Sequence, residues 1–261
     1  MVDVDLVMLA GNVGEYRGGI TLAENLPNND KLSLSLGGGR RNVYHRQVRF
    51  NSDWNQLQKR LDATLDKEQH KFYDAEADHL FTIGHENTHS LGPKNPHNKL
   101  GKYSHIIEEN KADMGSLAFV DLLTELGYYT EEQRLQIIVT TTVDNFLKTK
   151  PKIEQAHRVR TVMQNYYLFK RGAYSITEEG KIHVNVEKVV PAARQMLEEI
   201  VRIQLENDFS KGEKYVLENF VWTEEMEKVG VALREVSKKL NGRLETKLQD
   251  YLLGMNEMKD M

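Results

Sequence analysis

Residues 85–113 read HENTHSLGPKNPHNKLGKYSHIIEENKAD and contain the motifs that decide the fold and the candidate site. This segment opens with an HExxH motif, in which His85 and His89 are four residues apart. On a helix these two positions share one face, so both imidazoles can bind the same ion. Glu86 lies about 100° further around the helix, where its carboxylate can reach a water beside that ion. The motif therefore predicts two ligands of a catalytic zinc site, with Glu86 as the general base.

A third ligand has to come from outside the motif, because a catalytic zinc site uses three protein ligands. Glu109 and Asp113 follow later in the segment and are again four residues apart, so they share a helix face. We expect Glu109 to bind the ion and Asp113 to accept a hydrogen bond from the far nitrogen of a ligand histidine. Glu108 points about 100° away from Glu109, so we expect it to support the site or to face solvent.

Two histidines are weaker alternatives for the third ligand. The pattern HExxHxxG at residues 85–92 is similar to the start of the metzincin signature, which requires a histidine where this chain has Asn95. His97 comes two residues later and after a proline, and His105 is further along the chain. We rank both of them below Glu109.

The spacing of HExxH and ExxxD resembles that of the gluzincins, the thermolysin-like metallopeptidases. Over roughly residues 20–175 the chain also resembles the dipeptidyl peptidase III family, metallopeptidase family 49, and its bacterial and Nudix-fused relatives. The segments that carry this resemblance are Asn25-Leu26-Pro27-Asn28, Gly39-Arg40-Arg41-Asn42-Val43, Glu108-Glu109-x-x-Ala112-Asp113 and Gln155-Ala156-His157. The sequence departs from the family pattern in two places. The family has HExxGH where this chain has HExxH, and an arginine where this chain has Thr161.

The resemblance implies a zinc-dependent exopeptidase that acts on short peptides and has a mostly helical catalytic lobe. It assigns Asn25 and Asn28 to binding the N-terminus and backbone of the substrate, and His157 to supporting the tetrahedral intermediate. Arg160, with Arg158, is the basic group nearest to the family's arginine position, so it is a candidate for a further substrate contact. A long N-terminal lobe precedes the matched region in that family. We expect the role of that lobe to be taken by an N-terminal lobe outside the matched region or by a partner chain, and a homo-oligomer is also possible.

Composition limits the partners. The chain has 261 residues, a formal net charge of −4 and no cysteine, so any zinc must be held by histidine and carboxylate. The negative charge gives no reason to expect nucleic acid or a membrane as partner, and we expect the basic segment 40–49 to be a solvated strand face. The apolar run from Leu6 to Ala10 is too short for a signal peptide or a membrane span. A soluble, cytoplasmic protein is therefore expected.

We predict a mainly α fold of the α+β class, with a helical zincin-like catalytic lobe. Residues 1–52 alternate short apolar runs with glycines, which predicts a β-rich N-terminal segment packed on that lobe, with strands at Leu6–Ala10, Leu32–Leu36 and Val43–Phe50. Residues 53–261 are predicted to form the helical metallohydrolase domain. Apolar spacing predicts helices over residues 54–65, 73–91, 105–126, 130–148, 152–171 and 191–253, a polar loop over 94–104, and a hairpin over 172–186.

Two other interpretations stay open. The chain could bind zinc without catalysis, as a helical binding or scaffold protein derived from the same family. Alternatively, HExxH could occur by chance in a structural helical bundle, which predicts that no stoichiometric metal is bound.

Overall fold

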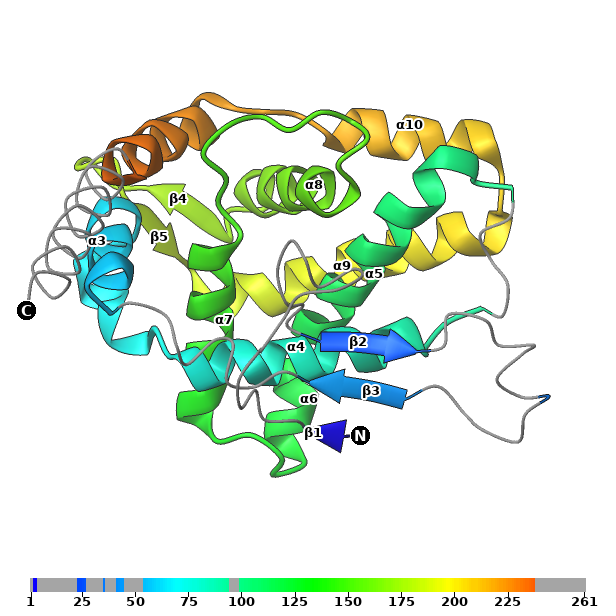
Figure 1. Ribbon diagram of the computed structural model, residues 1–261, viewed down its shortest axis with the longest axis horizontal. Helices are drawn as coiled ribbons and strands as arrows, with labels where there is room; N and C mark the ends of the chain where they lie inside the picture. Colours follow the sequence, from blue (N-terminus) through cyan, green and yellow to red (C-terminus); the bar gives the residue numbers. More distant parts are fainter. Residues whose placement is uncertain are drawn as a thin grey trace, which may run out of the picture.

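The computed structural model describes residues 2–3, 23–26, 35, 41–44, 54–93 and 99–237. Within these ranges the chain is mainly helical with two small sheets (Figure 1), which confirms the predicted fold class. None of the helices in these ranges is long and apolar enough to cross a lipid bilayer. The elements in chain order are β1 Val2–Asp3, β2 Ala23–Leu26, β3 Arg41–Tyr44, α3 Trp54–Thr64, the 3-10 helix η2 Lys67–Phe72, α4 Ala75–His89, the 3-10 helix η3 Gly101–Tyr103, α5 Ser104–Ala118, α6 Val120–Glu125, α7 Glu131–Asp144, α8 Ala156–Lys170, β4 Tyr174–Ile176, β5 Ile182–Val184, α9 Val186–Glu206 and α10 Phe209–Asn219, followed by a helical segment at 224–237.

Helix α5 is the centre of the helical part. It packs against α4, α8, α9 and α10, and every residue from 109 to 118 is buried. A helix that is buried all round has no solvent face on which to place polar residues. Nevertheless α5 carries buried polar or charged side chains, namely Glu109, Asn110, Lys111, Asp113 and Ser116. Their partners therefore have to come from the surrounding helices.

Helices α4 and α5 approach each other closely, because each contributes a glycine where the other has a small side chain. A Cβ atom on Gly84 would lie 2.3 Å from the Oγ of Ser116, and one on Gly115 would lie 2.2 Å from the Cγ2 of Thr88. Neither position has room for a larger residue. The close approach holds the HExxH turn of α4 against the middle of α5.

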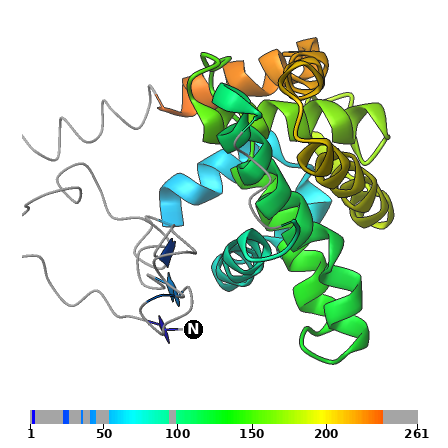
Figure 2. The ribbon, with the colours of Figure 1, turned by 90° about the vertical axis from the view of Figure 1, so that its right-hand side faces the viewer.

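The first sheet has the strand order β1-β3-β2 and lies beside α4 (Figure 2). Strand β1 pairs parallel with β3, and β2 pairs antiparallel with β3 in a register that sets Asn25 opposite Asn42. Tyr44 of β3 is buried, and its ring contacts His79 of α4 edge to face. The division of the chain into a segment 1–52 and a domain 53–261 stays a prediction.

The second sheet is the predicted hairpin. Strands β4 and β5 are antiparallel, with Tyr174 opposite Val184 and Ile176 opposite Ile182. The turn at residues 178–180 closes on Gly180, which has a φ of 77° that favours glycine. Leu65, just after α3, bridges to Ile182 and ties the hairpin to that helix.

Several of the predicted elements differ from the observed ones, among them the helical region predicted over 191–253, whose described part is divided into α9, α10 and the segment 224–237. The helix predicted over 105–126 is two helices that meet at Phe119, and the polar loop over 94–104 ends in η3. Helix α9 begins at Val186 rather than at Pro191. Pro191 lies inside the helix, where its missing N–H removes the bond to the carbonyl of Glu187 in the first turn. Ser35, the one described residue of the predicted strand 32–36, is helical and exposed. The predicted strand at residues 6–10 lies outside the described residues.

Candidate metal centre

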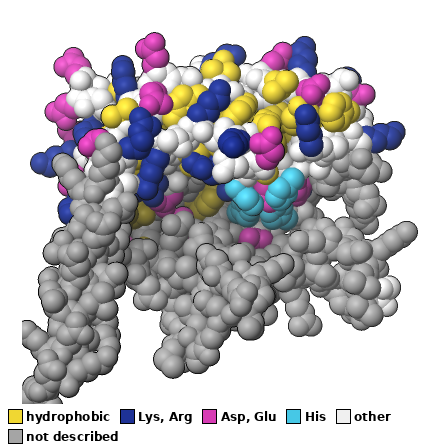
Figure 3. All heavy atoms as spheres, turned by 45° about the horizontal axis from the view of Figure 1, so that its top comes forward, with side chains coloured by type: hydrophobic (Ala, Val, Ile, Leu, Met, Phe, Trp, Pro, Cys, Tyr) yellow, Lys and Arg dark blue, Asp and Glu magenta, His cyan; other side chains and the backbone are white. Residues whose placement is uncertain are grey.

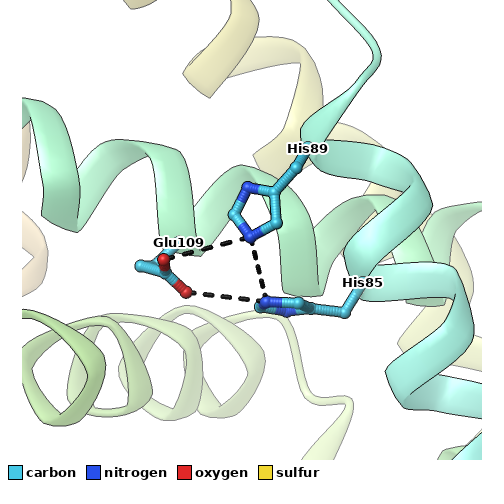
Figure 4. Close-up of side chains that lie close together, drawn as sticks. All are labelled: His85, His89 and Glu109. Carbon is cyan, nitrogen blue, oxygen red and sulfur yellow. Dashed lines mark hydrogen bonds and ion pairs between the residues drawn. The ribbon is translucent and has the colours of Figure 1, made fainter. Parts of the chain in front are cut away.

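Histidine side chains gather at one place on the face of the molecule drawn in Figure 3, with acidic side chains among them. In Figure 4, two histidines from consecutive turns at the end of α4 face one carboxylate of α5. The Nε2 atoms of His85 and His89 are 3.1 Å apart. Oε2 of Glu109 lies 3.6 Å from Nε2 of His85, and Oε1 lies 3.9 Å from Nε2 of His89. The packing of α4 against α5 therefore brings together the three side chains that the sequence predicts as metal ligands.

The arrangement fits a metal ion. Ligands 2.0–2.1 Å from a tetrahedral zinc are about 3.3 Å apart. The two Nε2 atoms are near this separation, the distances to the two different oxygens of Glu109 are slightly longer, and one atom from each side chain lies within 4.8 Å of the others. Glu109 is 6% exposed, and its Oε2 makes no well-directed hydrogen bond within the described part of the chain. A buried carboxylate oxygen without a hydrogen bond is costly unless another group, such as a cation, satisfies it.

Each candidate ligand histidine is held by a carboxylate on its far nitrogen. Nδ1 of His85 lies 2.6 Å from Oδ1 of Asp113, and Nδ1 of His89 lies 2.9 Å from Oε1 of Glu108. Because Nδ1 donates to these carboxylates, Nε2 is left as the acceptor atom that faces the other ring. Asp113 and Glu108 therefore fix the orientation that binding one ion through Nε2 requires.

Three residues that the sequence did not single out support these carboxylates. Nζ of Lys111 is 2.9 Å from Oε1 of Glu108 and donates to the carbonyl of Leu91 at 2.7 Å. Gln204 of α9 donates to Oε2 of Glu108 at 2.8 Å. Gln164 of α8 donates to Oδ2 of Asp113 at 3.0 Å. Lys111 is three residues from Glu108 on the same helix, whereas the two glutamines are 96 and 51 positions from their partners, so only the tertiary fold brings them to the site.

The electrostatics favour a neutral imidazole on His85 and an ionised carboxylate on Glu109. Burial, helped by the nearby charge of Arg160, lowers the pKa of His85 from 6.5 to about 3. Burial acts to raise the pKa of Glu109, but the contact with His157 and the charges of the histidines outweigh it and lower that pKa to about 2. Neutral imidazole and ionised carboxylate are the protonation states that bind a metal.

The predicted catalytic residues lie beside this centre. Glu86 is 8% exposed and is near enough to His85 for its charge to act on the pKa of that ring. His157, near the start of α8, has Nδ1 3.1 Å from Oε2 of Glu109. This carboxylate raises the pKa of His157 through their direct contact and its charge, so a protonated ring is favoured.

The predicted substrate-binding residues have different positions. The guanidinium of Arg160 forms an ion pair with Asp113, so its described contact is to the carboxylate that holds His85. Asn25 belongs to β2, whereas Asn28 lies outside the described residues. The substrate contacts of all three stay predictions. Of the two weaker candidates for third ligand, His97 lies outside the described residues.

Comparisons with known proteins agree with this fold. The structure of DPP III from Caldithrix abyssi superposes with a TM-score of 0.73, is 26% identical, and covers 82% of this chain and 43% of its own. Dipeptidyl-peptidase III from Corallococcus sp. strain EGB gives a TM-score of 0.71 at 20% identity and covers 84% of this chain and 44% of its own. Nudix hydrolase 3 of Arabidopsis thaliana is 25% identical over 215 residues, which are 78% of this chain and 28% of that protein.

No protein-family model matches the sequence. The chain spans less than half the length of each of these three relatives. Over the part that it shares with the two solved structures, the chain has a DPP III-like peptidase fold, and within it three side chains are arranged so that they could hold a metal ion.

Proposed function

We propose that this chain is a zinc-dependent peptidase, an exopeptidase of the dipeptidyl peptidase III type that acts on short peptides. The observation that carries the proposal is the convergence of His85, His89 and Glu109. The two Nε2 atoms are 3.1 Å apart, each lies 3.6–3.9 Å from an oxygen of Glu109, and Oε2 makes no well-directed hydrogen bond to a described residue. Tetrahedral zinc with three protein ligands and an open fourth position is the hydrolytic form of such a site. The DPP III-like fold and the absence of cysteine support the same ligand set.

Zinc in such a site supplies a water whose pKa is lowered to about 7 and polarises the scissile carbonyl. Glu86 would hold the proton removed from that water on its carboxylate and pass it to the leaving amine. Its position one residue after His85 places it on the same turn as a ligand without making it one.

His157 would donate from its ring to the oxygen of the carbonyl as negative charge develops there. Its raised pKa supports this role, because a protonated ring is present in a larger fraction of molecules near neutral pH. Asn25 and Asn28 would bind the N-terminus and backbone of the peptide. Arg160 would contact the substrate while its guanidinium is held by the ion pair with Asp113.

The test compares Glu86→Gln with wild type. We expect the variant to retain one zinc per chain by elemental analysis and to lose turnover of a library of short peptides followed by mass spectrometry. Glu76→Gln, on the exposed first turn of the same helix, is the matched control and should retain both zinc and turnover. Unchanged hydrolysis by Glu86→Gln would refute the assignment, and a wild-type chain without zinc would refute the whole proposal.

A second candidate function is zinc binding without turnover, as in a binding or scaffold protein. The cluster of His85, His89 and Glu109 supports it equally, because holding an ion requires these three ligands and no catalytic base. Stoichiometric zinc in wild type, together with no hydrolysis of any peptide in the library, would select this function over the peptidase.

A further inference from the structure

A second pair of histidines faces the same carboxylate as the first pair. His105 lies one turn before Glu109 on α5, with its Nδ1 3.8 Å from Oε1 of Glu109. His157 comes from α8, with its Nδ1 3.1 Å from Oε2. One ligand atom from each of these three residues lies within 4.8 Å of the others. Each oxygen of Glu109 therefore lies near one ring of each histidine pair.

The second pair resembles the first in geometry. The rings of His105 and His157 meet edge to face, with centroids 5.3 Å apart and planes at 81°. The rings of His85 and His89 also meet edge to face, at 4.7 Å and 88°. In both pairs, two imidazole nitrogens face one carboxylate, which is the donor set that zinc and neighbouring transition metals prefer.

We propose that His105, Glu109 and His157 form a second site for a divalent transition-metal ion such as zinc, and that Glu109 bridges it to the first site. Glu109 is itself buried, and its Oε2 makes no well-directed hydrogen bond to any residue that the structure describes, so this oxygen is open to a cation. Glu109 offers two oxygens, and each lies within 4 Å of one ring from each pair, so this one carboxylate could contact two ions, as in two-metal hydrolase sites.

The second site is the weaker of the two. The side chains of His105 and His157 are 61% and 63% exposed, whereas those of His85 and His89 are 13% and 14% exposed. In the described ranges, no carboxylate holds the far nitrogen of His105 or His157 in the way that Asp113 holds His85. Loss of such a partner typically costs ten- to a hundredfold in metal affinity. The second ion should therefore exchange readily with solvent and bind only at higher metal concentration.

Occupation of the second site would change what His157 can do. An ion bound to Nδ1 of His157, the nitrogen that faces Oε2 of Glu109 at 3.1 Å, would displace the proton of that nitrogen to solvent. A coordinated His157 is then no longer the cationic donor that the proposed function requires, so filling the second site should lower turnover. This consequence rests on the proposed function, whereas binding of the second ion does not.

The test is a calorimetric titration of the metal-free full chain with zinc chloride. Wild type should show two binding events per chain, one tight and one weaker. His105→Gln and His157→Gln should each retain the tight event and lose the weaker one. His183→Gln is the matched control, because His183 is also a half-exposed histidine paired with a carboxylate, Asp66, but belongs to neither cluster.

The outcomes separate this inference from the proposed function. His85→Gln should lose the tight event and retain the weaker one. If wild type shows only the weaker zinc-binding event, and this event depends on His105, the second site is supported and the peptidase proposal is refuted. A wild-type chain with one tight event up to millimolar zinc, or a weaker event that survives in either His105→Gln or His157→Gln, would overturn the second site.

Cobalt(II) in place of zinc tests the shared carboxylate. Two paramagnetic ions bridged by one carboxylate couple magnetically, so the electron paramagnetic resonance signal per cobalt should decrease as the second site fills. In His105→Gln the signal should instead rise in proportion to the single bound cobalt. A signal that simply doubles in wild type would contradict a bridge through Glu109.

Discussion

Gly115→Ala tests whether the close approach of α4 and α5 sets the geometry of the metal centre. The added Cβ would lie 2.2 Å from Cγ2 and 2.8 Å from Oγ1 of Thr88, whereas ordinary contacts begin at 3.4 Å. The helices must therefore separate, or Thr88 must rotate and lose the 2.8 Å hydrogen bond from its hydroxyl to the carbonyl of Gly84. Either change reaches His89, the next residue along α4.

The magnitude follows from two opposing effects. Replacing glycine by alanine within a helix stabilises it by about 1 kcal/mol. Overpacking a tight core contact costs roughly 1–3 kcal/mol. Because 2.2 Å is far below the contact distance, we expect overpacking to prevail. The free energy of unfolding should fall by about 1–2 kcal/mol, and zinc affinity by about tenfold, which is ~1.4 kcal/mol.

The measurements are urea denaturation of the metal-free chain and zinc affinity by competition with a chelator. The double variant Thr88→Ala/Gly115→Ala removes both γ atoms and should recover the zinc affinity of wild type. The double-mutant cycle should show a coupling of at least ~1 kcal/mol between the two positions. The reasoning fails if Gly115→Ala alone is more stable than wild type and binds zinc equally well, because the helix-propensity effect would then be acting without a clash.

Three further predictions concern the partners of the ligand rings. Asp113→Asn removes the carboxylate charge beside Nδ1 of His85 and should weaken zinc binding about 10–100-fold in the chelator competition; an affinity within twofold of wild type would contradict it. Lys111→Met keeps the alkyl chain but removes the ammonium that contacts Glu108, and should lower the free energy of unfolding by about 1–3 kcal/mol in urea, whereas an unchanged value would show that this buried contact is dispensable. Burial lowers the pKa of His85 from 6.5 to about 3. Between these two pH values, His85 of the unfolded chain takes up a proton that His85 of the folded chain does not. The stability of the metal-free chain should therefore fall as the pH falls, by about 2 kcal/mol between about pH 7 and pH 5 for this residue. His85→Gln should lack that share of the pH dependence, and equal slopes for the two proteins would refute the lowered pKa.

The sequence predicted the elements that depend on local pattern. HExxH and ExxxD specify where a helix turn presents ligands, and the structure brings His85, His89 and Glu109 together. The hairpin followed from its glycine turn and alternating strands. The break at Phe119 was missed because apolar spacing continues across it and the last turn of α5 closes on its own carbonyls.

The sequence could not identify the support of the site. Lys111 sits between charged and small residues and would ordinarily be placed on a solvated face. Its side chain is buried because α5 is surrounded by other helices, which no window of local sequence reveals. The glutamines that hold Glu108 and Asp113 are likewise distant in the chain, and only the assembled fold makes them partners.

The polarity of α5 is itself an argument for a bound cation. A central helix is stabilised most by apolar side chains, and replacing buried ionic groups with apolar residues of similar volume is often neutral or stabilising. Yet α5 buries Glu109, Lys111 and Asp113, and within the described residues one oxygen of Glu109 makes no well-directed hydrogen bond. Lys111 and Asp113 can be accounted for as the groups that orient the histidine rings through direct or relayed contacts. Glu109 is placed differently, because its two oxygens lie near four imidazoles, and this arrangement suits a bound cation better than it suits a packed core.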